Sequence, residues 1–315
     1  MILKAFGFQS PTSHTLLENA MSMGKRLRTI LDRKGVTIAP GAIDVLSCLL
    51  FQEIGYEMIW AGGFMSSASQ IGWADANVLT LTEHATYVRN IRLATNLPIL
   101  VDIDNGYGGA VNVIRTIREM EQAGAAGVML EDQVIPKRCA LFPGSRPIIS
   151  KEEMIGKLKA ALDARTDESF VIAARTDSFG AGLSVNEAID RASAYVETGV
   201  DAILPISKKW ENLERFATTA KLKVPLITAP TLFPQITTAH LDTVGFKIMI
   251  QPLIAAQVAL KAMKEAMTTV LREGTPLSLV DRALTFPELS ALLRLDEVAG
   301  WEEKFVPSGT SLVGA

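Results

Sequence analysis

Eight short apolar runs recur along the 315-residue chain, and longer segments with helical spacing separate them. A continuous apolar run bounded by turn residues is typical of a buried parallel strand, whereas apolar residues at every third or fourth position indicate an amphipathic helix. The helical pattern is clearest over 110–123, 151–164, 184–198 and 210–220. The predicted strands are 36–40, 58–62, 98–102, 127–131, 170–175, 202–205, 224–228 and 247–251.

This alternation predicts a parallel sheet whose strands are joined by helical crossovers. Gly124, Gly199 and Gly245 stand where helices are expected to end, as C-cap glycines do. Eight such units close naturally into an α/β fold of the (β/α)8 TIM barrel type, and an open doubly wound sheet is the second choice. The expected parts of a single domain, 1–315, are an N-terminal helical segment, 1–34, the barrel, 35–272, and a C-terminal helical extension, 273–315.

A helix is also predicted over 16–31, before the first strand, where it would close the barrel bottom or contact a partner. Hydrophobic residues make up 48% of the chain, charged residues 21%, and the formal net charge is −3, so a core is expected and nucleic acid is not. The apolar stretch 248–263 is shorter than the roughly 20 residues of a membrane span. Two cysteines and no apolar leader indicate a cytoplasmic protein.

Three carboxylates stand at the ends of two predicted strands. Asp102 and Asp104 follow the run 98–102, and Glu131 ends the run 127–131. Side chains at the carboxyl ends of parallel strands face the mouth of a barrel, where such enzymes carry out their chemistry. Carboxylates there are suitable ligands for a hard metal ion. The alternative is that these acids are solvated loop residues or helix caps.

Four sequence blocks occur in an order that points to one family. They are Gly-Trp-Ala-Asp-Ala-Asn at 72–77, Asp-x-Asp-x-Gly-Tyr-Gly at 102–108, Glu-Asp-x-x-x-Pro-Lys at 131–137 and Ala-Arg-Thr-Asp at 174–177. Over residues 28–272 the chain resembles the phosphoenolpyruvate mutase and isocitrate lyase superfamily. The resemblance implies a Mg²⁺-dependent barrel enzyme acting on 2-oxo or 2-hydroxy acids. It also implies a homodimer or homotetramer whose subunits exchange the last barrel helix.

The resemblance implies a role for each carboxylate. Asp102 would bind Mg²⁺ directly, with Mn²⁺ as an alternative ion, and Asp75, Asp104 and Glu131 would hold its water molecules. Asp75 is also a predicted substrate contact. The metal would orient the substrate and stabilise an enolate. Arg175, at the end of the fifth predicted strand, would pair with a carboxylate or phosphonate of the substrate; the alternative is a structural ion pair.

Residues 60–64 read Trp-Ala-Gly-Gly-Phe and resemble a segment of the family whose backbone amides bind the substrate carboxylate. Gly62 and Gly63 permit such a close approach of the ligand to the backbone. Trp60 is expected to form a wall of the pocket or to pack in the core. Phe64 is the remaining predicted contact in this segment.

The loop after the fourth predicted strand, 136–146, mixes features of two subgroups. Lyases that cleave C–C bonds carry Lys-Lys/Arg-Cys-Gly-His here, and the cysteine exchanges a proton with the departing carbanion. This chain keeps Lys137, Arg138 and Cys139 but has Ala and Leu in place of Gly-His. A thiol between Lys and Arg is expected to favour its thiolate, so Cys139 and Lys137 are candidate catalytic residues. The alternative is an inert cysteine packed by loop closure.

Ile206 stands where phosphonate-handling members of the family have a histidine. Together with Phe64 and Leu141, it suggests a substrate with an apolar branch. His84 and His240 are expected on the outside of the barrel, without a catalytic role.

The sequence therefore predicts a Mg²⁺-dependent lyase that cleaves a C–C bond of a small 2-hydroxy di- or tricarboxylic acid, of the 2-methylisocitrate or alkylmalate type, through an enolate. The main rival is an enzyme of P–C bonds acting on phosphonopyruvate or phosphoenolpyruvate, or an oxaloacetate-type decarboxylase. A barrel that binds a metabolite without converting it is a remote alternative. The expected partners are the carboxylic acid substrate and further copies of the chain, with no nucleic acid and no membrane.

Overall fold

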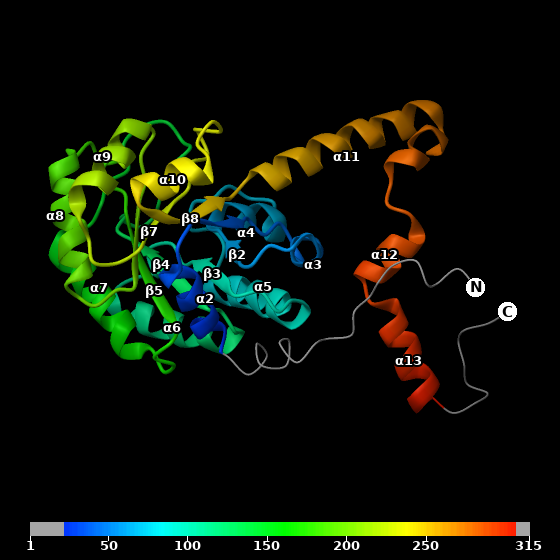
Figure 1. The fold of residues 1–315 in the computed structure, drawn as a ribbon, viewed down its shortest axis with the longest axis horizontal. Coiled ribbons are helices and arrows are strands. Elements are labelled where there is room, and N and C mark those ends of the chain that lie inside the picture. The colour runs from blue at the N-terminus through cyan, green and yellow to red at the C-terminus, as the bar shows by residue number, and fades with distance from the viewer. Residues whose placement is uncertain (1–21, 307–315) are drawn as a thin grey trace.

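The computed structural model describes residues 22–306, which form a barrel of eight parallel strands, surrounding helices and a helical arm (Figure 1). The strands are β1 (Thr37–Pro40), β2 (Ile59–Ala61), β3 (Ile99–Asp102), β4 (Gly127–Glu131), β5 (Val171–Thr176), β6 (Ala202–Pro205), β7 (Leu226–Thr228) and β8 (Phe246–Gln251). The helices before the arm are α2 (Met23–Asp32), α3 (Val45–Ile54), α4 (Gly63–Ile71), α5 (Leu81–Ala94), α6 (Ala110–Ala123), α7 (Lys151–Ala164), α8 (Val185–Val196), α9 (Trp210–Ala220) and α10 (Thr238–Val244). Every strand predicted from the sequence is present.

The strands follow one another around the barrel in the order of the sequence. Each strand from β2 to β8 pairs in parallel with the next, and β8 also pairs with β1. Between β1 and β2 a parallel bridge joins Gly41 to Trp60, and the Ala42 N–H donates to the Trp60 carbonyl oxygen at 2.9 Å. These contacts close the circle, so the prediction of a (β/α)8 TIM barrel is confirmed over the open sheet.

Local sequence signals define where the barrel helices begin and end. α8 starts at a capping box in which Ser184 and Glu187 each bond to the backbone of the other. α6 and α10 end at Gly124 and Gly245, both in the left-handed conformation, as predicted. α8 ends at Val196, and the predicted C-cap Gly199 lies beyond it in a following turn.

Apolar side chains form one core between the strands and the surrounding helices and another inside the barrel. The helix α2 closes the inner core, in which Leu27 and Leu31 are buried. The Arg28 side chain donates to the carbonyl oxygen of Ser169, just before β5. α2 therefore lies across the barrel bottom, as one of its two expected roles requires, while the predicted helical residues 16–21 lie outside the described residues.

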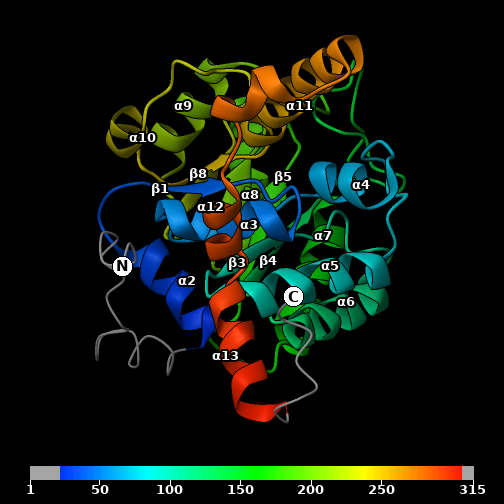
Figure 2. The same cartoon turned by 90° about the vertical axis from the view of Figure 1, so that its right-hand side faces the viewer.

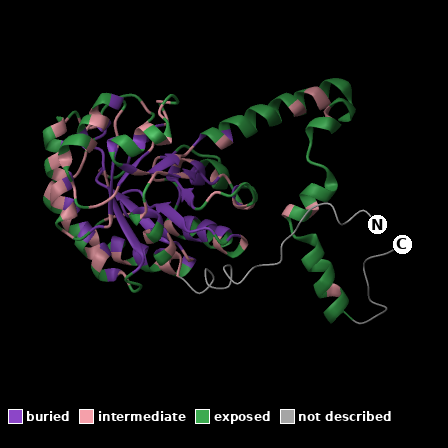
Figure 3. Ribbon diagram, in the orientation of Figure 1, coloured by how far each residue is buried: buried purple, intermediate pink, exposed green. Residues whose placement is uncertain are grey.

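The arm begins with α11 (Ile254–Glu273), which projects away from the barrel after β8 (Figures 1 and 2). Of its 20 residues Ala256 alone is buried, and most of the arm is exposed (Figure 3). The arm continues through η1 (Leu277–Arg282), α12 (Phe286–Leu292), which contacts α3, and α13 (Leu295–Phe305). α11, the helix that follows β8 and would cover it in a regular barrel, is thus part of the arm. The predicted boundary between barrel and extension at residue 272 stays a prediction.

Within residues 22–306, none of the helices combines the length and the apolar composition that a membrane crossing requires. The apolar stretch 248–263 is divided between β8 and the first half of α11. The cytoplasmic location stays a prediction.

Candidate active site

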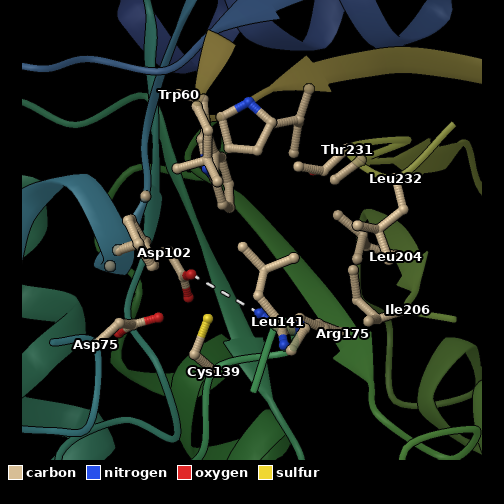
Figure 4. Close-up of a pocket in the computed structure, with 18 of the residues that line it drawn as sticks. Trp60, Asp75, Asp102, Cys139, Leu141, Arg175, Leu204, Ile206, Thr231 and Leu232 are labelled. Atoms are coloured by element: carbon tan, nitrogen blue, oxygen red, sulfur yellow. Dashed lines mark ion pairs between the residues drawn. The ribbon is translucent and has the colours of Figure 1, made fainter. Parts of the chain in front are cut away.

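A pocket opens at the carboxyl ends of the strands, where the barrel fold places active sites. Charged side chains lie on one side of it and apolar side chains on the other (Figure 4). Asp104 and Glu131 do not line the pocket but contact residues that do. The predicted site residues that line it are Trp60, Gly62, Gly63, Phe64, Asp75, Asp102, Lys137, Cys139, Arg175 and Ile206.

The Lys137 ammonium lies between two of the predicted metal-binding carboxylates. Its Nζ is 2.7 Å from Asp75 Oδ1 and also pairs with Asp104 Oδ1, and its side chain is 1% exposed. Burial raises the pKa of Asp104 to about 7, although Lys137 acts in the opposite direction. Burial lowers the pKa of Lys137, but Asp104 and Asp75 outweigh it and hold the pKa well above its ordinary value. We call the four predicted metal-binding carboxylates, Asp75, Asp102, Asp104 and Glu131, the acidic set. Lys137 is therefore a charged partner of the acidic set, and its catalytic role stays a prediction.

Arg175, near the end of β5, belongs both to the pocket wall and to an ion-pair network. Its Nη1 lies 2.9 Å from Glu131 Oε2 and 3.9 Å from Asp102 Oδ2. Its Nε lies 2.8 Å from Asp177 Oδ2. The structural ion pair that was the alternative for Arg175 is therefore present, and the guanidinium also faces the pocket, where it can meet a substrate carboxylate.

Arg146, the last residue of the loop 136–146, holds Asp177 from the other side. Its Nε lies 2.8 Å from Asp177 Oδ1, and a Cβ added to Gly180 would lie 2.3 Å from its Nη2. Burial raises the pKa of Asp177, but the two arginines outweigh it and the pKa lies below the ordinary value. Asp177 therefore fixes Arg175 while it anchors the loop.

Asn77 ties the acidic set to the loop, a role that the sequence did not reveal. Its Nδ2 donates to Asp104 Oδ2 at 3.1 Å, and its Oδ1 accepts from the Lys137 N–H at 2.6 Å. Asn77 and Asp104 have φ angles of 57° and 52°, in the left-handed region that Asn and Asp tolerate better than most residues. The available signal was an asparagine two residues after Asp75.

The charge of the acidic set suits a divalent cation, but its side chains do not form a complete coordination shell. Within the described residues no group of three Asp, Glu, His or Cys side chains has metal-site geometry. Four carboxylates face the cations of Lys137 and Arg175, so the fully ionised set would carry excess negative charge. Glu131 is fully buried, and its Oε2 forms an ion pair with Arg175, but neither oxygen receives a hydrogen bond of good geometry from a described residue. Burial raises its pKa well above the ordinary value, although Arg175 acts in the opposite direction. A cation would stabilise its ionised form, so the donor set fits Mg²⁺.

The turn from β2 into α4 presents backbone amides to the pocket. Gly62 is the N-cap of α4 and Gly63 is its first residue. A Cβ on Gly63 would lie 2.8 Å from Asp104 Oδ1 and 2.9 Å from Lys137 Nζ, and one on Gly62 would lie 2.3 Å from Trp60 Nε1. Because the first amides of a helix have no partner within it, this turn can bind a carboxylate.

Cys139 lies in the loop, and its Sγ points into the same space as the Asp102 carboxylate (Figure 4). The residue is 7% exposed. Burial raises the pKa of the thiol, and a hydrogen bond with the Leu141 backbone and the charge of Lys137 lower it only in part. Arg138 also lines the pocket, and its side chain donates to the Pro143 carbonyl oxygen at 2.9 Å. The expected thiolate is therefore wrong, because burial outweighs the neighbouring charge and the structure favours a neutral thiol.

The wall opposite the carboxylates is mainly apolar, with Thr231 as a polar residue on it. Leu204 of β6, Ile206 just beyond it and Leu232 after β7 lie together on this side, and Leu141 of the loop projects between them and the carboxylates (Figure 4). Leu141 and Leu232 are 37% and 50% exposed, so they stand at the mouth. Further apolar lining residues are Leu213, Ala229, Phe233, Ile250 and Leu253.

The prediction that His84 lies outside the barrel is wrong, since the residue is 1% exposed. Its Nε2 lies 3.2 Å from Ser66 Oγ of α4, and its Nδ1 lies 2.8 Å from the Tyr107 hydroxyl oxygen. Burial lowers the pKa of His84 to about 4, so the ring is neutral near pH 7. It links α4 to the loop after β3. His240 does lie on the outer helix α10, with 40% of its side chain exposed.

The sequence and the fold have counterparts among known proteins. The family model described as phosphoenolpyruvate phosphomutase matches residues 27–271. The 2,3-dimethylmalate lyase of Eubacterium barkeri is 36% identical over 291 residues, covering 90% of this chain and 99% of that protein. The 2-methylisocitrate lyase of Escherichia coli strain K12 is 37% identical over 272 residues, covering 85% of this chain and 91% of that protein. The crystal structure of a phosphonopyruvate hydrolase complex with oxalate and Mg²⁺ has a TM-score of 0.85 and 32% identity, covering 91% of this chain and 100% of that one. The chain belongs to the phosphoenolpyruvate mutase and isocitrate lyase superfamily, as its sequence blocks predicted.

Proposed function

We propose that the protein is a Mg²⁺-dependent lyase that cleaves a C–C bond of a small 2-hydroxy di- or tricarboxylic acid and releases a 2-oxo acid. The observation that carries this proposal is that one pocket brings together the acidic set around Asp102, the amides of the Gly62 turn and the thiol of Cys139. Similarity to a 2,3-dimethylmalate lyase and a 2-methylisocitrate lyase supports C–C cleavage.

Each part of the charged half has a place in substrate binding. Mg²⁺ bound at this site would polarise the carboxylate and hydroxyl oxygens of the substrate and stabilise developing negative charge. Asp102 would hold the ion directly, and Asp75, Asp104 and Glu131 would accept hydrogen bonds from its water molecules. The first amides of α4 and the Arg175 guanidinium orient the substrate carboxylate.

Cleavage breaks the bond between C2, which carries the hydroxyl, and C3. The electron pair of this bond stays on C3 and is delocalised into the adjoining carboxylate as an enolate. Cys139 protonates C3, and the proton lost from the hydroxyl restores the thiol. A raised pKa keeps the Cys139 thiol protonated near neutral pH, which suits a proton donor.

A P–C bond enzyme is the rival function, and similarity to a phosphonopyruvate hydrolase favours it. The apolar side chains of Leu204 and Ile206 offer a phosphonate no hydrogen bond. We therefore place the P–C reaction second. An oxaloacetate-type decarboxylase would use the same charged half and differs in the bond that breaks.

We also propose that the working form is a homodimer or homotetramer in which subunits exchange α11. Val258, Met263 and Met267 of this helix are 60%, 60% and 58% exposed. Leu46 and Leu50 of α3, which follows the β8 neighbour β1, are 44% and 40% exposed. Apolar surface of this extent on an extended helix is expected to be covered by another copy of the chain.

The proposed function is tested by measuring 2-oxo acid release, with Mg²⁺ and with EDTA, from 2-methylisocitrate, 2,3-dimethylmalate, oxaloacetate and phosphonopyruvate. EDTA-sensitive pyruvate formation from a hydroxy acid is the expected result. Phosphate release from phosphonopyruvate would move the function to the rival, and no product from any compound would overturn it. Cys139→Ser should lower kcat by about 100-fold or more, and undiminished turnover would remove Cys139 from the mechanism.

A further inference from the structure

The division of the pocket into two halves identifies which branch the substrate carries. We propose that the substituent on C3 of the substrate is an uncharged alkyl group larger than methyl, and that Leu141 and Leu232 select it. This inference rests on the proposed lyase function and adds the substrate class to it.

The charged half sets the direction in which the substrate lies. The C1 carboxylate and the C2 hydroxyl belong beside Asp102 and the first amides of α4. In this orientation we place a substituent on C3 away from the carboxylates. The wall formed by Leu204, Ile206 and Leu232 lies on that side of the pocket (Figure 4). The chemical character of that wall therefore decides which C3 substituents are accepted.

A carboxylate on this branch would have to draw one of two lining cations, Lys208 or Arg138, from the bond that each makes to a backbone carbonyl. Lys208 lies at the edge of the apolar half, and its Nζ donates to the Phe142 carbonyl oxygen at 2.7 Å. Arg138 donates to the carbonyl oxygen of Pro143 at 2.9 Å. Removing an unpaired carboxylate from water is costly, whereas burying an alkyl group is favourable. The apolar half thus disfavours a carboxymethyl branch.

Two leucines stand where the branch would end. Leu141 comes from the loop and Leu232 from the segment after β7, and they are 37% and 50% exposed. An alkyl group placed between them would remove this apolar surface from water. The Lys208 bond to Phe142, the residue after Leu141, holds the loop leucine over the pocket. Both leucines and the loop anchor therefore act on the same branch.

The test compares three 2-methylmalates whose C3 substituents are methyl, isobutyl and carboxymethyl. Isobutyl and carboxymethyl have nearly the same shape and differ in charge, so they separate polarity from size. We expect kcat/KM to rise about fourfold for each carbon buried from methyl to isobutyl. We expect the isobutyl substrate to exceed the carboxymethyl substrate by about 10-fold or more.

Variants assign the preference to the two leucines. Leu141→Ala and Leu232→Ala should each lower kcat/KM for the isobutyl substrate by about 10-fold and affect the methyl substrate less. Leu93→Ala is the matched control, because Leu93 is 79% exposed on α5 and does not line the pocket. It should leave both values unchanged.

The possible outcomes separate the substrate class from the reaction. A preference for the carboxymethyl substrate that Lys208→Ala abolishes would show that Lys208 binds a second carboxylate, and it would overturn the inference while leaving the lyase intact. Equal kcat/KM for all three substrates would overturn it as well. If none of them yields pyruvate with Mg²⁺, the lyase function itself fails and the inference fails with it.

Discussion

The buried pair of Arg146 and Asp177 allows a quantitative prediction for Arg146→Ala. The two side chains are 3% and 0% exposed, and Nε lies 2.8 Å from Oδ1. Removing one member of a buried ion pair costs about 3–5 kcal/mol, because the other charge stays buried without its partner. Arg175 still pairs with Asp177 in the variant, so we expect a loss near ~3 kcal/mol.

This loss should lower the midpoint of thermal unfolding by about 6 °C, since ~1 kcal/mol corresponds to about 2 °C for a large domain. Calorimetry at one fixed protein concentration measures it, because the proposed assembly would make the midpoint depend on concentration. The matched control is Arg33→Ala, which removes an ion pair with Glu57 whose side chains are 38% and 53% exposed. Such an exposed pair contributes at most about 1 kcal/mol, so the control should shift the midpoint by about 2 °C or less.

Gly180 offers an independent route to the same pair. A Cβ there would lie 2.3 Å from Arg146 Nη2, and Gly180 has no positive φ, so Gly180→Ala displaces the guanidinium without straining the backbone. It should lower the midpoint in the same way, and the double variant should lose less than the sum of the single losses. The reasoning is refuted if Arg146→Ala unfolds at the wild-type temperature, or if the two losses are fully additive.

Three further predictions concern the metal, a buried histidine and the arm. Mg²⁺ should raise the unfolding midpoint by mass action, EDTA should reverse the shift, and Asp102→Asn should abolish it; an equal shift in the variant would contradict the proposed ligand. The pKa of His84 is about 4 in the native state, below its ordinary value of 6.5. As the pH falls from 6.5 toward 4, His84 therefore binds a proton in the unfolded chain but not in the native state, and the native state loses stability. Urea unfolding from pH 7 to pH 4.5 should show this loss in the wild type and not in His84→Gln, and identical pH dependence would refute it. Met263→Asp should shift the protein to monomers in light-scattering measurements, because Met263 is 60% exposed on α11, and an unchanged mass would argue against helix exchange.

The barrel and the acidic site could be predicted because both follow from local patterns. α6 and α9 begin and end where the sequence predicted, because apolar spacing and helix start and stop residues determine their bounds. The sequence could also predict that three carboxylates, Asp102, Asp104 and Glu131, lie at one site. The carboxyl ends of parallel strands meet at the same end of a barrel, whatever the details of the packing.

Side-chain directions in irregular segments could not be predicted. Lys137 and Arg138 are close to Cys139 in the sequence, but Lys137 pairs with the acidic set and Arg138 bonds to the loop backbone. Their positions in the sequence therefore led to the wrong prediction that the Cys139 thiol is ionised. His84 was misplaced because its partners come from α4 and from the loop after β3, which only the folded barrel brings to it. Helical spacing likewise predicts that α11 forms but not where it docks.

Lys137 belongs to the loop at the pocket, yet its ammonium balances Asp75 and Asp104 of the acidic set. A movement of the loop that withdrew the ammonium would therefore leave Asp75 and Asp104 freer to bind a cation. In thermodynamic terms, bound cation would then favour that movement by the same factor. One lysine would thus couple access to the pocket to its ionic occupancy.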